Sequence, residues 1–251
     1  MENEHVGRVV LVTAAAGAGL GQAIARRFAA DGASVVVTDV HEGRTTEVAA
    51  AIAADYPAAT VVGYPLDVGV CSQIDQVVDD VRVRLGPVEV LVNNAAVNIT
   101  RALSDCSVAD WERTIAVNLT GPWYLSRQVM PHMRAAGQGV IINIGSYAGD
   151  LGVEGPYAVT KGGMNALTRA CAREGAEHRI RAVTVSTGII TDTKWARDRP
   201  EQLDQPEVRS PLGSYPVTAE IAETVAFLAS SHARHITGDV VNIGSGAYMR
   251  T

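Results

Sequence analysis

The feature that most constrains the fold is the alternation of short β-branched runs with longer, alanine-rich amphipathic segments along the 251 residues. Seven runs are candidate strands: VVLVT (9–13), SVVVTD (34–39), TVVGY (60–64), VEVLVNN (88–94), GVIINIG (139–145), IRAVTVS (180–186) and DVVNIG (239–244). Near-continuous apolar runs are typical of strands buried on both faces of a parallel sheet. The segments between them have the length and pattern of helices, and LGQAIARRFAADG ends at Gly32, a residue suited to stop a helix.

This alternation predicts an α/β fold, with a doubly wound parallel sheet of about seven strands and helices on both faces. We expect a single domain over residues 1–251, since a chain of this length can close one core. Ligands of such sheets bind at the carboxyl ends of the strands, so functional residues should directly follow strands. The proline-rich, charged stretch 191–216 has no clear period, and we expect a lid or substrate loop over about 189–216.

Composition excludes several classes of function. The net charge is −6 and no stripe of Lys or Arg occurs, which argues against nucleic acid as a partner. No apolar run approaches the ~20 residues that span a bilayer, and MENEHVGR lacks the features of a signal peptide, so we expect a soluble, cytoplasmic protein. Cys71, Cys106 and Cys171 are far apart, which predicts neither a disulfide framework nor a metal site.

The first strand runs into a glycine-rich turn, where Gly17, Gly19 and Gly21 open the first long helix. Such glycines let the backbone approach a pyrophosphate, which the helix N-terminus attracts. Asp39 ends the second strand and can accept both hydroxyls of an adenosine ribose while repelling a 2′-phosphate. Together these residues predict a nicotinamide cofactor, with NAD preferred over NADP. The alternatives are an ordinary strand-to-helix turn and an ordinary turn acid.

A second group of residues has the chemistry of an acid/base centre. Tyr157 and Lys161 are four apart on the opening of a predicted helix and therefore share a face. A neighbouring ammonium is expected to lower the tyrosine pKa, so that the hydroxyl exchanges a proton with an alcohol or carbonyl oxygen. Ser146 follows the fifth strand and could hold that oxygen, although a local turn bond is the commoner fate of such a serine.

These motifs, in this order, resemble the short-chain dehydrogenases/reductases of the simple, NAD-dependent type. The likeness covers nearly the whole chain and is carried by the glycine-rich turn, Asp39, LDV, LVNNAA, AVNLTGPW, IINIGSYAG, YAVTK and the C-terminal AETVAFLASSHARHITGDVVNIG. The resemblance implies a Rossmann fold, a homotetramer and an NAD(P)-dependent interconversion of an alcohol and a ketone.

The resemblance also implies roles for individual residues. Tyr157 would exchange the proton, Lys161 would lower its pKa and bind the nicotinamide ribose, Ser146 would orient the substrate oxygen, and Asn118 would hold a water in a proton relay. Implied cofactor contacts, besides Tyr157 and Lys161, are Gly17, Gly19, Leu20, Gly21, Asp39, Asp67, Val68, Asn94, Ala95, Gly188, Ile190 and Thr193.

The chain departs from the family pattern mainly around the nicotinamide and the substrate. Ala14 stands where the family's turn usually has glycine, and this turn is one residue longer. The loop from Ser146 to Tyr157 is two residues shorter than usual, and Thr187-Gly188 replaces a Pro-Gly. We therefore expect family chemistry on a pocket of unusual shape. Its candidate lining residues are Tyr147, Val153, Ile189 and Trp195, although Trp195 could equally anchor the lid.

The leading hypothesis is an NAD-dependent oxidoreductase that interconverts a secondary alcohol and its ketone, with Tyr157 as acid/base. A catalytically silent nucleotide-binding sensor on the same fold is the alternative, motivated by the altered motifs. A nucleotide-sugar epimerase or dehydratase fits less well, because only about 65 residues follow the sixth strand.

Overall fold

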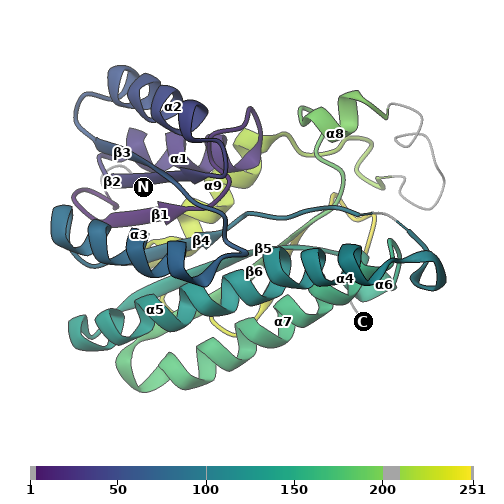
Figure 1. The fold of residues 1–251 in the computed structure, drawn as a ribbon. Helices are drawn as coiled ribbons and strands as arrows, with labels where there is room; N and C mark the ends of the chain where they lie inside the picture. Colours follow the sequence, from purple (N-terminus) through teal and green to yellow (C-terminus); the bar gives the residue numbers. More distant parts are fainter. Residues whose placement is uncertain (1–3, 100, 200–209, 250–251) are drawn as a thin grey trace.

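The chain folds into a seven-stranded parallel sheet between two layers of helices (Figure 1). The structure is a computed structural model that describes residues 4–99, 101–199 and 210–249. The strands are β1 (Val9–Val12), β2 (Ser34–Asp39), β3 (Thr60–Pro65), β4 (Val90–Asn93), β5 (Gly139–Ser146), β6 (Ile180–Thr187) and β7 (Val240–Ile243). Each predicted strand is thus confirmed, with its ends within two residues of those expected.

The strand order is β3-β2-β1-β4-β5-β6-β7, and every neighbouring pair is parallel. The chain winds outward from β1 in one direction and from β4 in the other, which confirms the doubly wound topology. The change of direction lies between β1 and β4, and a crevice for ligands opens there at the carboxyl edge of such sheets.

Helices of the two layers come from different parts of the chain (Figure 1). The longer helices are α1 (Leu20–Ala30), α2 (Glu42–Asp55), α3 (Cys71–Arg84), α4 (Val108–Ile115), α5 (Gly121–Ala136), α7 (Pro156–Gly175) and α9 (Thr218–Ala229). Residues of α1, α2 and α9 form one core cluster with the sheet, whereas residues of α3, α5 and α7 form another on the opposite face.

Alternation along β1 shows why this strand is apolar at every position. Val10 and Val12 belong to the core on the α1 and α9 side, and Val9 and Leu11 belong to the core on the α3, α5 and α7 side. Because successive side chains of a strand point to opposite faces, a strand covered on both faces needs apolar residues throughout.

The segment expected to form a lid is only partly described. It contains a short helix, α8 (Lys194–Arg197), which Figure 1 shows apart from both helical layers, and residues 200–209 of the predicted loop lie outside the described residues. Asp192 anchors the segment to α9, since its carboxylate accepts hydrogen bonds from Thr218 N at 2.8 Å and Thr218 Oγ1 at 2.7 Å.

Among the described helices none is long and apolar enough to span a bilayer.

Candidate active site

The turn between β1 and α1 is open on one side and tightly packed on the other. A Cβ placed on Gly17 or Gly19 would have no atom within 4 Å, so both backbones face open space. A Cβ on Gly21 would instead lie 2.4 Å from Ala14 O and 2.6 Å from Asn94 Nδ2. Within the described part of the chain, no side chain caps the N-terminus of α1 at Gly19. This arrangement leaves helix N–H groups accessible to an anion and fits a pyrophosphate.

The altered first half of this turn keeps a conformation that favours glycine. Ala14 has φ +52°, in the left-handed region, so alanine is accommodated there against its intrinsic preference. Thr13 ties the turn to the end of β4, because its Oγ1 accepts hydrogen bonds from Asn94 N at 2.8 Å and Ala95 N at 2.9 Å. Ala14 therefore replaces the family's usual glycine while its backbone adopts the left-handed conformation that glycine favours.

Asp39 lies at the carboxyl end of β2 with one neighbour that the sequence motifs did not single out. Its Oδ1 accepts a hydrogen bond from His41 N at 3.2 Å, which is the local turn bond considered as the alternative. Arg44 Nη2 lies 3.5 Å from the same oxygen, and the Arg44 side chain is half exposed. The place predicted for the adenosine ribose thus holds a carboxylate and a guanidinium side by side.

The Asp67 carboxylate interacts with two other residues of the chain. Its carboxylate forms an ion pair with Arg113 at 3.1 Å and accepts a hydrogen bond from Gly69 N at 2.8 Å. The neighbouring Val68 carbonyl would lie 2.5 Å from a Cβ at Gly121, so the start of α5 is pressed against it. Both residues, implied cofactor contacts in the sequence, therefore follow β3 at its carboxyl end, and the Asp67 carboxylate stabilises the turn there.

Ser146, Tyr157 and Lys161 meet at the carboxyl end of β5. Ser146 is the last residue of that strand, and its Oγ accepts a hydrogen bond from Ala148 N at 3.2 Å. Lys161 Nζ lies 5.3 Å from the centroid of the Tyr157 ring and donates to Ile144 O at 2.6 Å. The predicted sharing of a helix face thus places an ammonium beside the phenol.

The expectation of a lowered tyrosine pKa is wrong for the chain alone. Burial raises the pKa of Tyr157 well above its usual value, and the negative charge of Glu154 raises it further, while the Ser146 hydrogen bond opposes both effects. Burial also lowers the pKa of Lys161 to about 8. The physical reason is desolvation, which penalises the charged form of each buried group more than their proximity favours it.

Asn118 connects the centre to the segment after β4. It lies in a π-helical segment, Ala116–Thr120, and its Oδ1 accepts from Val97 N at 2.8 Å. Its Nδ2 donates to Val97 O at 2.9 Å and to Thr160 Oγ1 at 3.2 Å. Thr160 in turn donates to the Tyr157 carbonyl at 2.7 Å, so Asn118 positions the first turn of α7. Its predicted part in a water relay stays a prediction.

The predicted pocket residues differ in their surroundings. Tyr147 is buried, and its ring stands against Gly188, where an added Cβ would lie 2.3 Å from it. Ile189 is also buried, whereas Val153 is exposed. Trp195 lies in α8 with the Arg199 guanidinium 5.4 Å from its ring centroid, a contact within the lid itself. Ile190 and Thr193 remain at the base of the lid, where Thr193 Oγ1 donates to Ile190 O at 2.8 Å.

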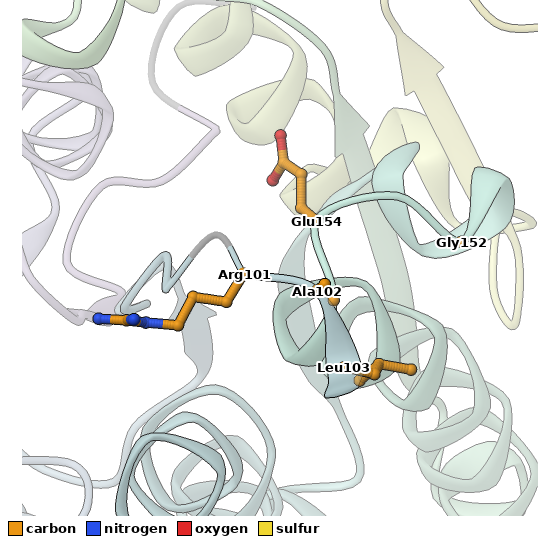
Figure 2. Close-up of a pocket in the computed structure, with 6 residues that line it drawn as sticks. Arg101, Ala102, Leu103, Gly152 and Glu154 are labelled. Atoms are coloured by element: carbon orange, nitrogen blue, oxygen red, sulfur yellow. The ribbon is translucent and has the colours of Figure 1, made fainter. Parts of the chain in front are cut away.

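Glu154 is the residue at this site that sequence reasoning missed. Figure 2 shows it on the wall of a cavity of about 530 Å³, lined by Arg101, Ala102, Leu103, Gly152, Glu154 and Gly155. Burial raises the pKa of both Tyr157 and Tyr147, and the negative charge of Glu154 adds to the rise in each case. An acid within the shortened loop, three residues before the tyrosine, was the available signal.

The predicted cofactor residues lie at or after the carboxyl ends of β1 to β6. These six strands are neighbours in the sheet, in the order β3-β2-β1-β4-β5-β6. The open backbone at Gly17 and Gly19 and the uncapped start of α1 fit a dinucleotide. Over residues 4–99, 101–199 and 210–249, no group of three His, Cys, Asp or Glu side chains is arranged to hold a metal ion.

Comparisons with known proteins agree with this geometry. A family model described as enoyl-(acyl carrier protein) reductase matches residues 14–247. A solved structure from Brucella melitensis, described as a short-chain dehydrogenase/reductase of the glucose/ribitol dehydrogenase type, superposes with a TM-score of 0.87 at 30% identity over 100% of both chains. The chain belongs to the short-chain dehydrogenase/reductase family, and it is an oxidoreductase of the kind that uses a nicotinamide cofactor.

Several characterised relatives span nearly the whole chain. It is 36% identical to a Mycobacterium tuberculosis hydroxy-methyl-oxo-hexahydroindene-carboxyl-CoA reductase, covering 94% of this chain and 92% of that protein. It is 35% identical to the 3-oxoacyl-[acyl-carrier-protein] reductase FabG of Escherichia coli, covering 97% and 98%. It is 32% identical to meso-2,3-butanediol dehydrogenase of Serratia marcescens, covering 96% and 94%.

Proposed function

We propose that the protein is an NAD(H)-dependent dehydrogenase/ketoreductase that interconverts a secondary alcohol and its ketone. The observation that carries this proposal is the triad of Ser146, Tyr157 and Lys161 at the carboxyl end of β5, with Ser146 as the last residue of that strand and the ammonium 5.3 Å from the centroid of the phenol ring. The relatives reduce or oxidise carbonyl and hydroxyl groups on different skeletons according to their names, which supports the reaction class.

In this mechanism the bound nicotinamide supplies or accepts the hydride, and the protein handles the substrate oxygen. The Ser146 and Tyr157 hydroxyls donate hydrogen bonds to the carbonyl oxygen as it becomes alkoxide-like. Tyr157 then transfers its proton to that oxygen. A tyrosine is protonated at neutral pH even at its ordinary pKa of about 10, so the hydroxyl has this proton to give.

In this proposal Lys161 also binds the ribose of the nicotinamide cofactor. An ammonium has three donors, and Ile144 O accepts one of them, so two can serve the hydroxyls of a nicotinamide ribose. Those hydrogen bonds would favour the charged lysine, whose field would then favour tyrosinate in the oxidative direction. Asn118 maintains the first turn of α7 that carries both groups.

The test is Tyr157→Phe, with Tyr56→Phe at the end of α2 as a matched control. We expect kcat/KM for a good ketone to fall by about 100-fold or more, because the ring and its packing remain while the proton donor is lost. NADH binding, followed by fluorescence, should persist. A Tyr157→Phe enzyme within about tenfold of the unmodified protein would overturn the acid/base assignment.

The same measurement separates this proposal from the silent sensor. NADH binding without absorbance change at 340 nm across a broad panel of ketones and alcohols would favour the sensor. The altered glycine-rich turn gives that alternative little support, since Ala14 adopts the left-handed conformation and Gly17 and Gly19 still face open space.

We also propose a homotetramer in the cytoplasm. Support for the oligomer comes from apolar side chains left exposed on α5 and α7, such as Trp123 and Val159. Trp123 also lines a hollow of about 480 Å³ between those two helices. Exposed apolar faces of this kind favour association with another copy of the chain.

A further inference from the structure

A row of buried polar side chains crosses three strands on the face that α7 covers. Asn93, Asn143 and Thr184 are register partners in β4, β5 and β6, and all three are buried. The residues two positions earlier in the same strands belong to the apolar core on the α3, α5 and α7 side: Leu91, Ile141 and Ala182. Because side chains two apart in a strand share a face, polar groups replace one apolar row of that core.

Thr168 of α7 takes part in this row. Asn93 Nδ2 donates to Asn143 Oδ1 at 2.8 Å, and Asn143 Nδ2 donates to Thr168 Oγ1 at 2.8 Å. The hydroxyls of Thr168 and Thr184 share a further hydrogen bond at 2.7 Å. The buried Thr168 side chain is therefore bonded to β5 and to β6 at once.

The same face of α7 carries Lys161. Thr168 follows Lys161 by almost two full helical turns, so both side chains lie on the face turned to the sheet. Lys161 Nζ donates to Ile144 O at 2.6 Å, and Ile144 is the neighbour of Asn143 in β5. Helix α7 is thus bonded to adjacent residues of β5, once through the ammonium and once through the hydroxyl.

These directional bonds limit how α7 can lie on the sheet. Apolar contacts are non-directional, whereas a buried donor or acceptor that loses its partner is strongly unfavourable. A buried polar network whose members are paired therefore favours one arrangement of the elements that it joins. A shift of α7 along β5 would break the Asn143–Thr168 bond and move the Lys161 ammonium relative to the Tyr157 ring, whose centroid lies 5.3 Å away.

We propose that Thr168, through its hydrogen bond with Asn143, is a positioning residue that sets where α7 holds the Lys161 ammonium beside Tyr157. The inference rests on the proposed ketone reduction. Thr168 acts through Lys161 and not on the substrate itself, because it lies about 10 Å further along the helix axis than the lysine.

The first test is Thr168→Val, which keeps the shape of the side chain and removes its hydroxyl. Asn143 Nδ2 and Thr184 Oγ1 then lose a partner, so we expect α7 to shift. For the best ketone of a panel, kcat with NADH should fall by about tenfold while the ketone KM stays within about threefold. Thr168→Ser keeps the hydroxyl and should restore kcat to within about twofold. All rates are measured at a temperature at which circular dichroism shows each variant to be folded.

The pH profile of kcat is a second readout. An ammonium that loses an acceptor loses stabilisation of its charged form, so the pKa of Lys161 should fall in Thr168→Val. We expect the alkaline decline of kcat to begin about 0.5 pH unit or more lower in this variant, and at the original pH in Thr168→Ser. A loss of stability alone would leave this profile in place.

Thr114→Val is the matched control. Thr114 is likewise buried, and its Oγ1 donates to Asp110 O at 2.7 Å within α4, so this bond joins no second element to the sheet. Its removal should leave kcat and the pH profile unchanged. Thr168→Ala is the second variant if valine prevents folding, since alanine leaves room for a water that can partner Asn143 and Thr184. Without the direct bond to α7, kcat should fall in this variant as well.

The outcomes separate this inference from the proposed function. An unchanged kcat and pH profile in Thr168→Val or Thr168→Ala, with lower stability in urea, would show that the row only stabilises the fold and would overturn the inference. A fall in Thr168→Ser equal to that in Thr168→Val would overturn it too, because the hydroxyl would not be the cause. In both cases the unmodified protein still reduces ketones. If it binds NADH and reduces no ketone, the proposed function fails and this inference fails with it.

Discussion

At the residue scale, the choice between NAD and NADP depends on two oppositely charged side chains at the end of β2. Asp39 offers a carboxylate to a ribose diol, and Arg44 lies 3.5 Å from it with its side chain half exposed. The motifs pointed to Asp39 and therefore to NAD. The structure adds a cation that could accept a 2′-phosphate once the carboxylate is removed.

We therefore predict that the unmodified protein prefers NADH to NADPH, and that Asp39→Ala reduces the ratio of the two kcat/KM values by about 10- to 100-fold. The double variant Asp39→Ala/Arg44→Ala should change the ratio less, because no guanidinium remains to pair with the phosphate. Steady-state kinetics with both cofactors measures these ratios. Equal use of the two cofactors by the unmodified protein would contradict the role of Asp39.

At the scale of elements, the acid/base centre depends on how closely α6 (Ala148–Leu151) approaches α7. A Cβ at Gly149 in α6 would lie 2.5 Å from Gly162 N and 2.7 Å from Lys161 C, both backbone atoms of α7. No flexible side chain can move aside there. Helix α6 therefore packs backbone to backbone against the turn of α7 that carries Lys161.

We predict that Gly149→Ala lowers the free energy of unfolding by about 1–3 kcal/mol through overpacking, and lowers kcat because α7 shifts. Gly43→Ala is the matched control, since Gly43 lies in α2 with no atom within 4 Å of an added Cβ and should gain about 0.5–1 kcal/mol. Urea denaturation and ketone reduction measure both effects. Full stability and activity in Gly149→Ala would show that α6 and α7 can separate without consequence.

At the scale of the whole molecule, the N-terminal segment is bound to a helix from the other end of the chain. His5 is buried, its Nε2 lies 3.0 Å from Ala226 O in α9, and its ring packs edge-on against Phe28 of α1. Burial lowers the pKa of this histidine below its ordinary value of 6.5. The neutral imidazole is therefore the form that the fold accommodates.

This burial predicts a loss of stability in acid. Between the lowered pKa of folded His5 and 6.5, the unfolded chain binds more protons, so stability is fully present above pH 6.5 and falls as the pH drops. The contribution cannot exceed about 1.4 kcal/mol per pH unit for one proton. His5→Gln should flatten this part of the profile, whereas exposed His235→Gln should leave it unchanged; unfolding measured from pH 7 to pH 5 tests both. An unaltered slope in His5→Gln would assign the acid sensitivity to other groups.

The sequence by itself determined the sheet, its parallel direction and the edge at which function lies. Strands buried on both faces need apolar residues throughout, so a pattern such as VVLV of β1 predicts a central strand from the sequence alone. The spacing of Tyr157 and Lys161 was likewise enough to place both on one helix face, because helical geometry is local.

The tertiary structure alone decided what surrounds these residues. Desolvation raises the Tyr157 pKa against the expectation from its lysine neighbour, since burial depends on every element that covers the site. Glu154 has a left-handed backbone beside Gly155, which is pressed against the segment after β4, and Arg44 meets Asp39 at the start of α2. Burial and these contacts depend on how separate elements pack together, and a local pattern of residues does not specify that packing.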